Sequence, residues 1–161
     1  PVSQQAVRQG LLNVELAGRF QVLPGRPAVI LDVAHNPHAA AVLAENLDNM
    51  GFYPRTRAVF GMLRDKDVAG VIAALKSRID VWLPCSLEGP RAASADFLAE
   101  ALEAAGCRVG GRYASPAQAL REAQAGAGEG DRILAFGSFL TVAEVLRARA
   151  PKRMANGENF D

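Results

Sequence analysis

Short apolar runs alternate along the sequence with longer stretches rich in Ala and Leu, and this alternation constrains the fold more than any other feature. The short runs have the length of strands, and the longer stretches repeat apolar residues with the period of a helix. Strands that alternate with helices in this way are typical of βαβ units and a mostly parallel sheet. We therefore predict an α/β fold with a sheet of about six strands and helices on both faces.

The predicted strands cover residues 20–23, 28–34, 57–61, 81–84, 108–113 and 132–136. The runs at 30–34 and 133–136 are apolar on both faces, which is typical of central strands covered by helices on each side. We expect the edges of the sheet at 108–113 and around Phe20. One-sided apolar stripes predict helices at about 37–50, 68–79, 93–105, 116–125 and 141–148. The tail, residues 151–161, has too little apolar content to pack and is predicted to fray.

The composition is that of one globular domain, and it excludes several classes of protein. The chain has 161 residues, half of them hydrophobic, and a formal net charge of only +1, so we expect no nucleic acid as partner. No apolar run reaches the ~18 residues of a membrane span, so we expect no membrane partner either. Cys85 and Cys107 lie far apart without neighbouring histidines, which disfavours a metal site and favours a reduced, cytoplasmic chain.

Four strand ends are the places where chemistry is expected. In a parallel sheet, ligands bind beyond the carboxyl ends of the strands, where helix amino termini expose free N–H groups. These ends read DVAHNPHAA, FGMLRDKD, PCSLEGP and FGSFLTV. In the first, Asp32 either accepts hydrogen bonds from the loop or binds ribose hydroxyls. His35, at the corner before the next helix, either packs there or points into the crevice.

Ser138 and Arg19 are the other candidates, and each has an ordinary structural alternative. Ser138 follows a glycine after the second buried strand, where its hydroxyl either binds a ligand or only caps the helix. Arg19 is either a surface residue or a planar cation for stacking or anion contact. Lys66 stands in a run of mixed charge, which is usually solvated, so a phosphate contact there is less favoured. No G-x-x-x-x-G-K-[ST] loop is present, so the chain alone cannot cradle nucleotide phosphates.

Four segments carry a family resemblance: RQGLLNVELAGRFQV, AVILDVAHNPHAA, VFGMLRDKD and ILAFGSFLTVAEV. In this order they resemble the carboxyl-terminal part of the folylpolyglutamate synthase/dihydrofolate synthase family, within the Mur ligase superfamily. The resemblance covers about residues 7–146. It implies a linker end at 1–18, a Rossmann-like carboxyl-terminal domain at 19–150 and the tail at 151–161. An amino-terminal P-loop ATPase domain would precede it, and a sequence that begins without Met favours such a fragment.

The resemblance also implies a reaction and roles for single residues. The family uses ATP and magnesium to phosphorylate a pteroate or folate carboxylate, and the amine of L-glutamate attacks the resulting acyl phosphate. Arg19 and Asp32 occupy positions that contact ATP across the cleft between the domains, and His35 and Ser138 occupy positions that hold glutamate. The magnesium ligands are expected in the amino-terminal domain, so the isolated chain is expected to be inactive.

Two other functions remain open on the sequence. The chain could be a stand-alone Rossmann-like module that binds a small anion or nucleotide and catalyses nothing. It could also be the carboxyl-terminal domain of a Mur ligase that acts on a muramoyl peptide. The combination of GRFQ with HNPHAA favours a folate or dihydropteroate substrate over the muramoyl one.

Overall fold

The core of the molecule is a five-stranded sheet with the strand order β1-β2-β5-β3-β4. The computed structural model describes residues 19–158, and the predicted linker end at 1–18 lies outside this range. The strands are β1 (Gln21–Leu23), β2 (Ala28–Asp32), β3 (Thr56–Phe60), β4 (Val81–Pro84) and β5 (Arg132–Phe136). β1 is antiparallel to β2, and every other pair is parallel. The prediction of an α/β fold with a mostly parallel sheet is confirmed.

The two strands predicted to be central lie inside the sheet. β5 pairs with β2 on one side and with β3 on the other. All five residues of β5 are buried, as are the three middle residues of β2. In this register Asp32 and Phe60 both stand opposite Phe136, so the carboxyl ends of the three strands meet at one rim.

The prediction of a strand at 108–113 is wrong, although this segment does lie along the outer side of β4. Val109 forms a parallel bridge with Trp82 and Tyr113 forms one with Cys85, but no continuous ladder joins them. Gly110 and Gly111 lie between the two bridges, and glycine weakens a strand because it offers no side chain to pack. The described sheet therefore has five strands where the sequence predicts six.

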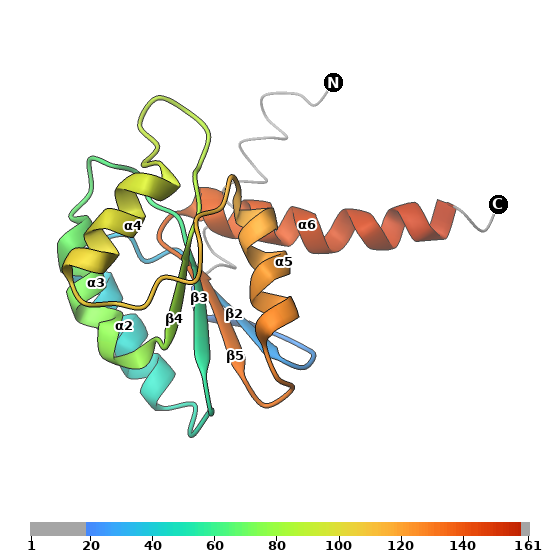
Figure 1. Cartoon of the computed structure of the whole chain (residues 1–161). Helices are drawn as coiled ribbons and strands as arrows, with labels where there is room; N and C mark the ends of the chain where they lie inside the picture. The colour runs from blue at the N-terminus through green and yellow to red at the C-terminus, as the bar shows by residue number, and fades with distance from the viewer. Residues whose placement is uncertain (1–18, 159–161) are drawn as a thin grey trace.

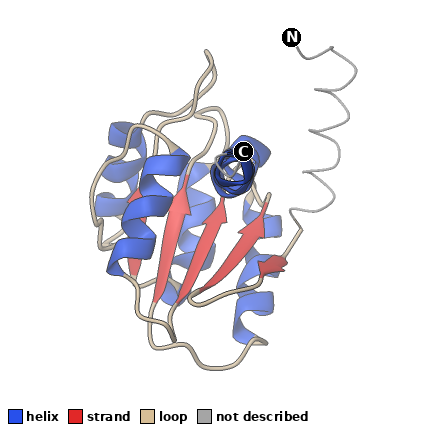
Figure 2. Ribbon diagram, turned by 90° about the vertical axis from the view of Figure 1, so that its right-hand side faces the viewer, coloured by secondary structure: helices blue, strands red, loops and turns tan. Residues whose placement is uncertain are grey.

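Helices cover both faces of the sheet, as predicted (Figures 1 and 2). One face carries α2 (Pro37–Asp48), α3 (Val68–Leu75) and α4 (Ala95–Ala104), and the short 3-10 helix η1 (Lys76–Arg78) follows α3. The other face carries α5 (Pro116–Gly126) and α6 (Phe139–Glu158). Four of these helices begin at side chains that accept a backbone N–H, which satisfies donors left free in the first turn. The caps are Asn36, Asp67, Ser94 and Ser115.

An aromatic cluster fills the core between the sheet and the α2–α4 layer. Phe60, Trp82 and Phe136 are fully buried, and the ring centroid of Phe60 lies 5.0 Å from each of the other two. Phe60 meets Trp82 edge to face, one of the arrangements that aromatic pairs prefer. This packing fixes the end of β3 and the end of β5 next to each other.

The last helix is longer than predicted at both ends. It begins at Phe139 rather than near Thr141, and the backbone stays helical as far as Glu158, through most of the segment predicted to fray. Residues 148–154 are mostly Ala, Lys, Arg and Met, which favour a helix, although Pro151 among them has no backbone N–H to donate. In Figure 1 the second half of α6 projects away from the sheet. Among the described residues, no helix is long and apolar enough to span a bilayer.

Candidate functional site

The candidate site lies at the rim where β2, β5 and β3 end. Residues 33–36 lead from β2 to α2, Gly137 and Ser138 lead from β5 into α6, and residues 61–67 lead from β3 to α3. Because the three strands are parallel and in register, these three loops lie side by side. This is the edge of an open parallel sheet at which ligands bind.

Asp32 holds the backbone around this rim. Its Oδ2 accepts a hydrogen bond from the N–H of Phe20 at 3.0 Å, and its Oδ1 accepts one from Ala34 at 2.8 Å. Burial raises the pKa of the Asp32 carboxyl above its ordinary value, and the two N–H bonds and the charge of Arg19 offset part of that effect. The sequence offered loop bonding and ribose binding as alternatives, and the loop bonds are present. Each carboxylate oxygen can still accept a further hydrogen bond from a ligand.

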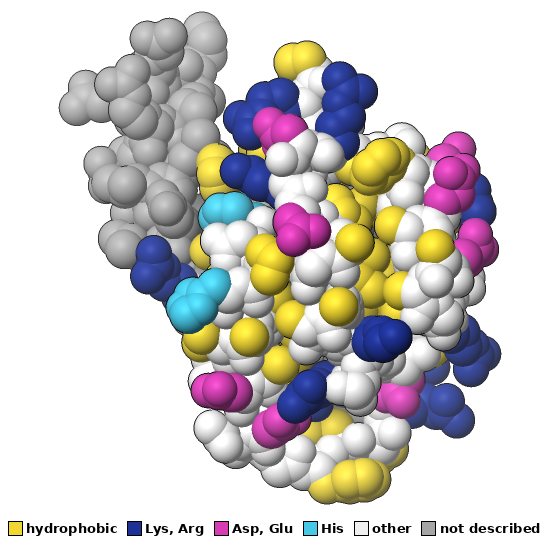
Figure 3. Space-filling view, turned by 90° about the vertical axis from the view of Figure 1, so that its left-hand side faces the viewer, with side chains coloured by type: hydrophobic (Ala, Val, Ile, Leu, Met, Phe, Trp, Pro, Cys, Tyr) yellow, Lys and Arg dark blue, Asp and Glu magenta, His cyan; other side chains and the backbone are white. Residues whose placement is uncertain are grey.

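The larger of two pockets at the rim contains the two residues predicted to contact ATP. This Asp32 pocket has a volume of about 460 Å³, and both Arg19 and Asp32 line it. That volume falls within the range of roughly 300–1,000 Å³ typical of small-molecule sites. Both histidines of the chain, cyan in Figure 3, also line it, on the same side of the molecule.

His35 stands between this pocket and a second one. Its ring Nδ1 lies 2.9 Å from the carbonyl oxygen of Val33, so this nitrogen donates its proton there. A neutral ring bonded in this way presents Nε2 as an acceptor, which makes the free nitrogen suited to an N–H or O–H of a ligand. His35 is half-buried, and among the described residues it is the one that lines both pockets.

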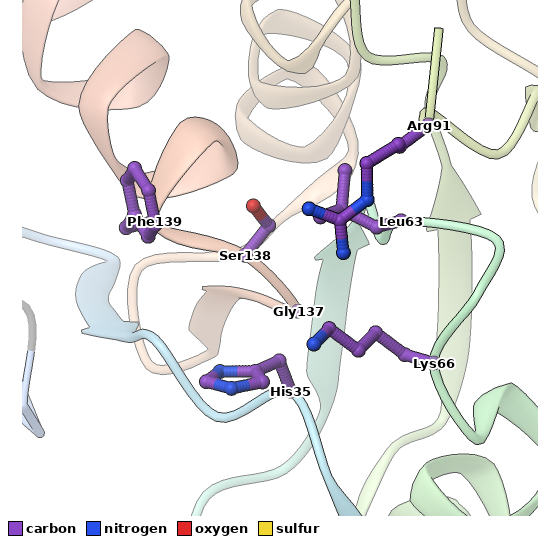
Figure 4. Close-up of a pocket in the computed structure, with 7 residues that line it drawn as sticks. All are labelled: His35, Leu63, Lys66, Arg91, Gly137, Ser138 and Phe139. Carbon is purple, nitrogen blue, oxygen red and sulfur yellow. The ribbon is translucent and has the colours of Figure 1, made fainter.

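The second pocket joins His35 to Ser138, the two residues predicted to hold glutamate. This Ser138 pocket has a volume of about 200 Å³ (Figure 4). Its lining consists of His35, Leu63, Lys66, Arg91, Gly137, Ser138 and Phe139. The Ser138 hydroxyl oxygen accepts a hydrogen bond from the N–H of Leu140 at 3.1 Å and so caps α6. Helix capping was one of the two roles that the sequence allowed for this hydroxyl. Its hydroxyl proton is still available to donate to a ligand.

The turn at Gly137 fixes the position of Ser138. Gly137 has a φ of +113°, and a Cβ atom there would collide with the carbonyl oxygen of Gly61. That same oxygen accepts a hydrogen bond from the buried Thr141 hydroxyl at 3.0 Å. Only glycine tolerates both the backbone conformation and the close approach, so the turn holds the start of α6 tightly against the loop after β3.

Two cations in the Ser138 pocket were not among the predicted site residues. Lys66 stands in a run of mixed charge that the sequence predicts to be solvated. Arg91 carries no sequence signal, because nothing in its local sequence distinguishes it from an ordinary surface Arg. Arg91 comes from the loop after β4, where its neighbour Ala92 forms an antiparallel bridge with Leu63. The lining contains Lys66, Arg91 and a histidine but no Asp or Glu. Asp65, outside the lining, forms an ion pair with Arg91, so a net positive charge remains from Lys66 and favours an anion.

The three rim loops form no metal-binding cluster in the described part of the chain. Within residues 19–158, no group of three or more His, Cys, Asp or Glu side chains is placed to hold a metal ion. The positively charged side chains that line the two pockets are Lys66, Arg91 and Arg19.

Comparison with known proteins places this geometry in a family. The family model described as "Mur ligase, glutamate ligase domain" matches residues 18–139. The chain is 45% identical, over 94% of its length, to the dihydrofolate synthase/folylpolyglutamate synthase of Escherichia coli, and this match spans 35% of that protein.

Solved structures agree with the sequence match. The Escherichia coli FolC protein in complex with DHPP and ADP superposes with a TM-score of 0.80 at 44% identity, over 95% of this chain and 36% of that one. A bifunctional folylpolyglutamate synthase/dihydrofolate synthase with Mn, AMPPNP and L-glutamate bound gives a TM-score of 0.75 at 47% identity, over 92% and 35% of the two chains. The chain thus spans about a third of the length of these relatives. By this match and by the fold described above, it belongs to the glutamate ligase domain family of the Mur ligases and corresponds to the carboxyl-terminal part of folylpolyglutamate synthase/dihydrofolate synthases.

Proposed function

We propose that this domain holds L-glutamate in the Ser138 pocket and contacts ATP through the Asp32 pocket, as part of a ligase that adds glutamate to dihydropteroate or folate. The observation that carries the proposal is the arrangement of the two pockets, which adjoin at His35. An amino acid in one pocket and a nucleotide next to the other would have their reacting ends close together. Such positioning is the main requirement of phosphoryl and acyl transfer.

The size and charge of the pockets support this division. The Ser138 pocket, at about 200 Å³, is smaller than a typical drug-sized site of roughly 300–1,000 Å³, and it carries two cations, which suits a small dicarboxylate. The Asp32 pocket is about twice as large and combines a carboxylate with the guanidinium of Arg19. That pair suits ribose hydroxyls and phosphate or base. The relatives support both ligands, since their structures contain ADP, AMPPNP, Mn and L-glutamate.

The proposed chemistry divides between two domains. ATP and magnesium would convert the substrate carboxylate to an acyl phosphate on an amino-terminal P-loop ATPase domain, which would also supply the magnesium ligands. This chain would hold glutamate with its amine towards that acyl phosphate, using Ser138 and His35, and would close on the nucleotide with Arg19 and Asp32. We call the protein that joins both domains the assembled ligase, and we propose that it acts in the cytoplasm.

The two alternative functions have less support. The relatives named above act in folate chemistry by their names, which favours folate over a muramoyl acceptor. A stand-alone module that binds one small anion or one nucleotide would need only one of the two pockets, and here both adjoin at His35. The direct way to separate a module from a ligase domain is an activity measurement.

The test compares the isolated chain with the assembled ligase. We expect the isolated chain to unfold in one cooperative thermal transition by circular dichroism, because both faces of its sheet are covered by packed helices. It should release no ADP with ATP, glutamate and dihydropteroate, whereas the assembled ligase should release ADP only when all three are present. Substrate-dependent ADP release by the isolated chain would contradict the division of labour, and an assembled protein without glutamate ligation would refute the proposed function.

A further inference from the structure

Arg91 is held in the Ser138 pocket by contacts that also fix its orientation. Its Nε and Nη2 both contact the Asp65 oxygen Oδ2, at 2.8 and 2.7 Å. Its backbone carbonyl accepts a hydrogen bond from the N–H of Arg64 at 2.8 Å, and Ala93 donates to the carbonyl of Met62 at 3.0 Å. The loop after β4 is therefore paired with the loop after β3, and Arg91 is a built part of the pocket wall.

The contact with Asp65 leaves one edge of the guanidinium available. An Arg side chain has five N–H donors in a planar fork, and Asp65 uses the edge formed by Nε and one hydrogen of Nη2. Nη1 and the second Nη2 hydrogen form the other edge, the geometry that binds a carboxylate through two parallel hydrogen bonds. Figure 4 shows the Arg91 guanidinium directed towards the space between Ser138 and Lys66.

The position of Arg91 indicates which end of an amino acid it would meet. His35 lines both pockets, whereas Arg91 lines only the Ser138 pocket. The amine of the incoming amino acid must face the reaction centre, so it lies at the His35 end. Its side chain then extends away from the nucleotide, towards Arg91. In Figure 4 Lys66 lies on the side of His35, and Arg91 lies on the opposite side of the pocket.

We propose that Arg91 binds the side-chain carboxylate of the incoming amino acid and thereby makes the ligase select a dicarboxylic amino acid. Asp65 is the positioning residue that orients the guanidinium for this contact. The inference rests on the proposed function and deepens it, because it assigns substrate selection to one residue from the loop after β4. An incoming amino acid with a neutral side chain of the same length as glutamate would leave the free edge of the Arg91 guanidinium without a charged partner.

The test compares L-glutamate with L-glutamine, which has the same length and an uncharged end. In the assembled ligase, Arg91→Gln and Arg91→Met should each lower kcat/KM for glutamate by about 10- to 100-fold, the range of a charge-assisted hydrogen bond, and change it little for glutamine. The KM for ATP should stay the same. Arg91→Lys keeps the charge but loses the fork, so it should recover part of the lost preference. Since Arg91 is 60% exposed, these variants should fold, and circular dichroism verifies this.

Arg112→Gln provides the matched control. Arg112 also forms exposed ion pairs, with Asp96 and Glu103, but it does not line the pocket. This variant should keep the wild-type ratio of glutamate to glutamine activity. The inference is overturned if Arg91→Gln and Arg91→Met also keep that ratio, or if the KM for ATP rises as much as that for glutamate. Absence of glutamate ligation in the unmodified assembled ligase would instead refute the proposed function itself.

Discussion

Asp32 holds two backbone N–H groups and faces a pocket at the same time. Its bonds to Phe20 and Ala34 explain why a carboxylate is tolerated at a place where burial raises its pKa. A residue with both roles cannot be tested by one substitution, because losing the loop bonds would disturb the pocket without any ligand. Arg19 is exposed, so its substitution gives a cleaner test of the same pocket.

We predict that Arg19→Ala and Asp32→Ala raise the KM for ATP in the assembled ligase. Under the proposed function each variant loses a charged hydrogen-bonding partner of the nucleotide, worth about 1.5–3 kcal/mol, so the increase should be about 10- to 100-fold. Asp131→Ala is the matched control, since Asp131 also accepts a loop N–H, from Gly128 at 2.8 Å, but stands before β5 at the opposite end of the strand. Steady-state kinetics and a thermal melt are measured for all three. If the KM for ATP is unchanged in both pocket variants, the prediction is wrong, and the role of Asp32 is limited to its hydrogen bonds with the loop.

The elements of the fold could largely be predicted from sequence, because burial on two faces leaves a clear apolar pattern. β2 and β5 were predicted as central for that reason, and they are. The segment 108–113 resembles a strand because Val109 and Tyr113 would fall on one face of an extended chain, but the two glycines between them leave only isolated bridges. The site could be predicted only where a buried apolar strand runs directly into a helix start, as at His35 and Ser138. Arg91 reaches the pocket through loop pairing, which leaves no local pattern.

The turn between β5 and α6 gives a prediction for a single element. Gly137→Ala should lower the free energy of unfolding by about 2–4 kcal/mol, since the added methyl group meets the carbonyl of Gly61 and the backbone is left-handed. Gly106→Ala is the control, because Gly106 also has a positive φ, +80°, but faces open space. The control should lose only about 1–2 kcal/mol. Urea unfolding measures both, and equal losses would show that the close approach of the two loops contributes nothing.

At the scale of the whole molecule, the sheet brings two pockets to one rim and His35 between them. Three loops that are distant in sequence form this rim because the strands before them are parallel and in register. Under the proposed function, the pockets become a reaction centre only when a P-loop ATPase domain faces them. The account therefore predicts that a substitution confined to one pocket raises the KM of one substrate much more than the KM of the other.

The most direct measurement is the effect of Ser138→Ala and His35→Ala on the KM values for glutamate and for ATP in the assembled ligase. We predict that both variants raise the KM for glutamate by about 10-fold or more and change the KM for ATP much less, because ground-state binding of one substrate is lost. Ser115→Ala is the control for the capping role of Ser138, since Ser115 caps α5 in the same way away from both pockets. For Ser138→Ala, which lies in the Ser138 pocket and not in the Asp32 pocket, an increase in the KM for ATP as large as that for glutamate would contradict the account and assign the Ser138 pocket to the nucleotide.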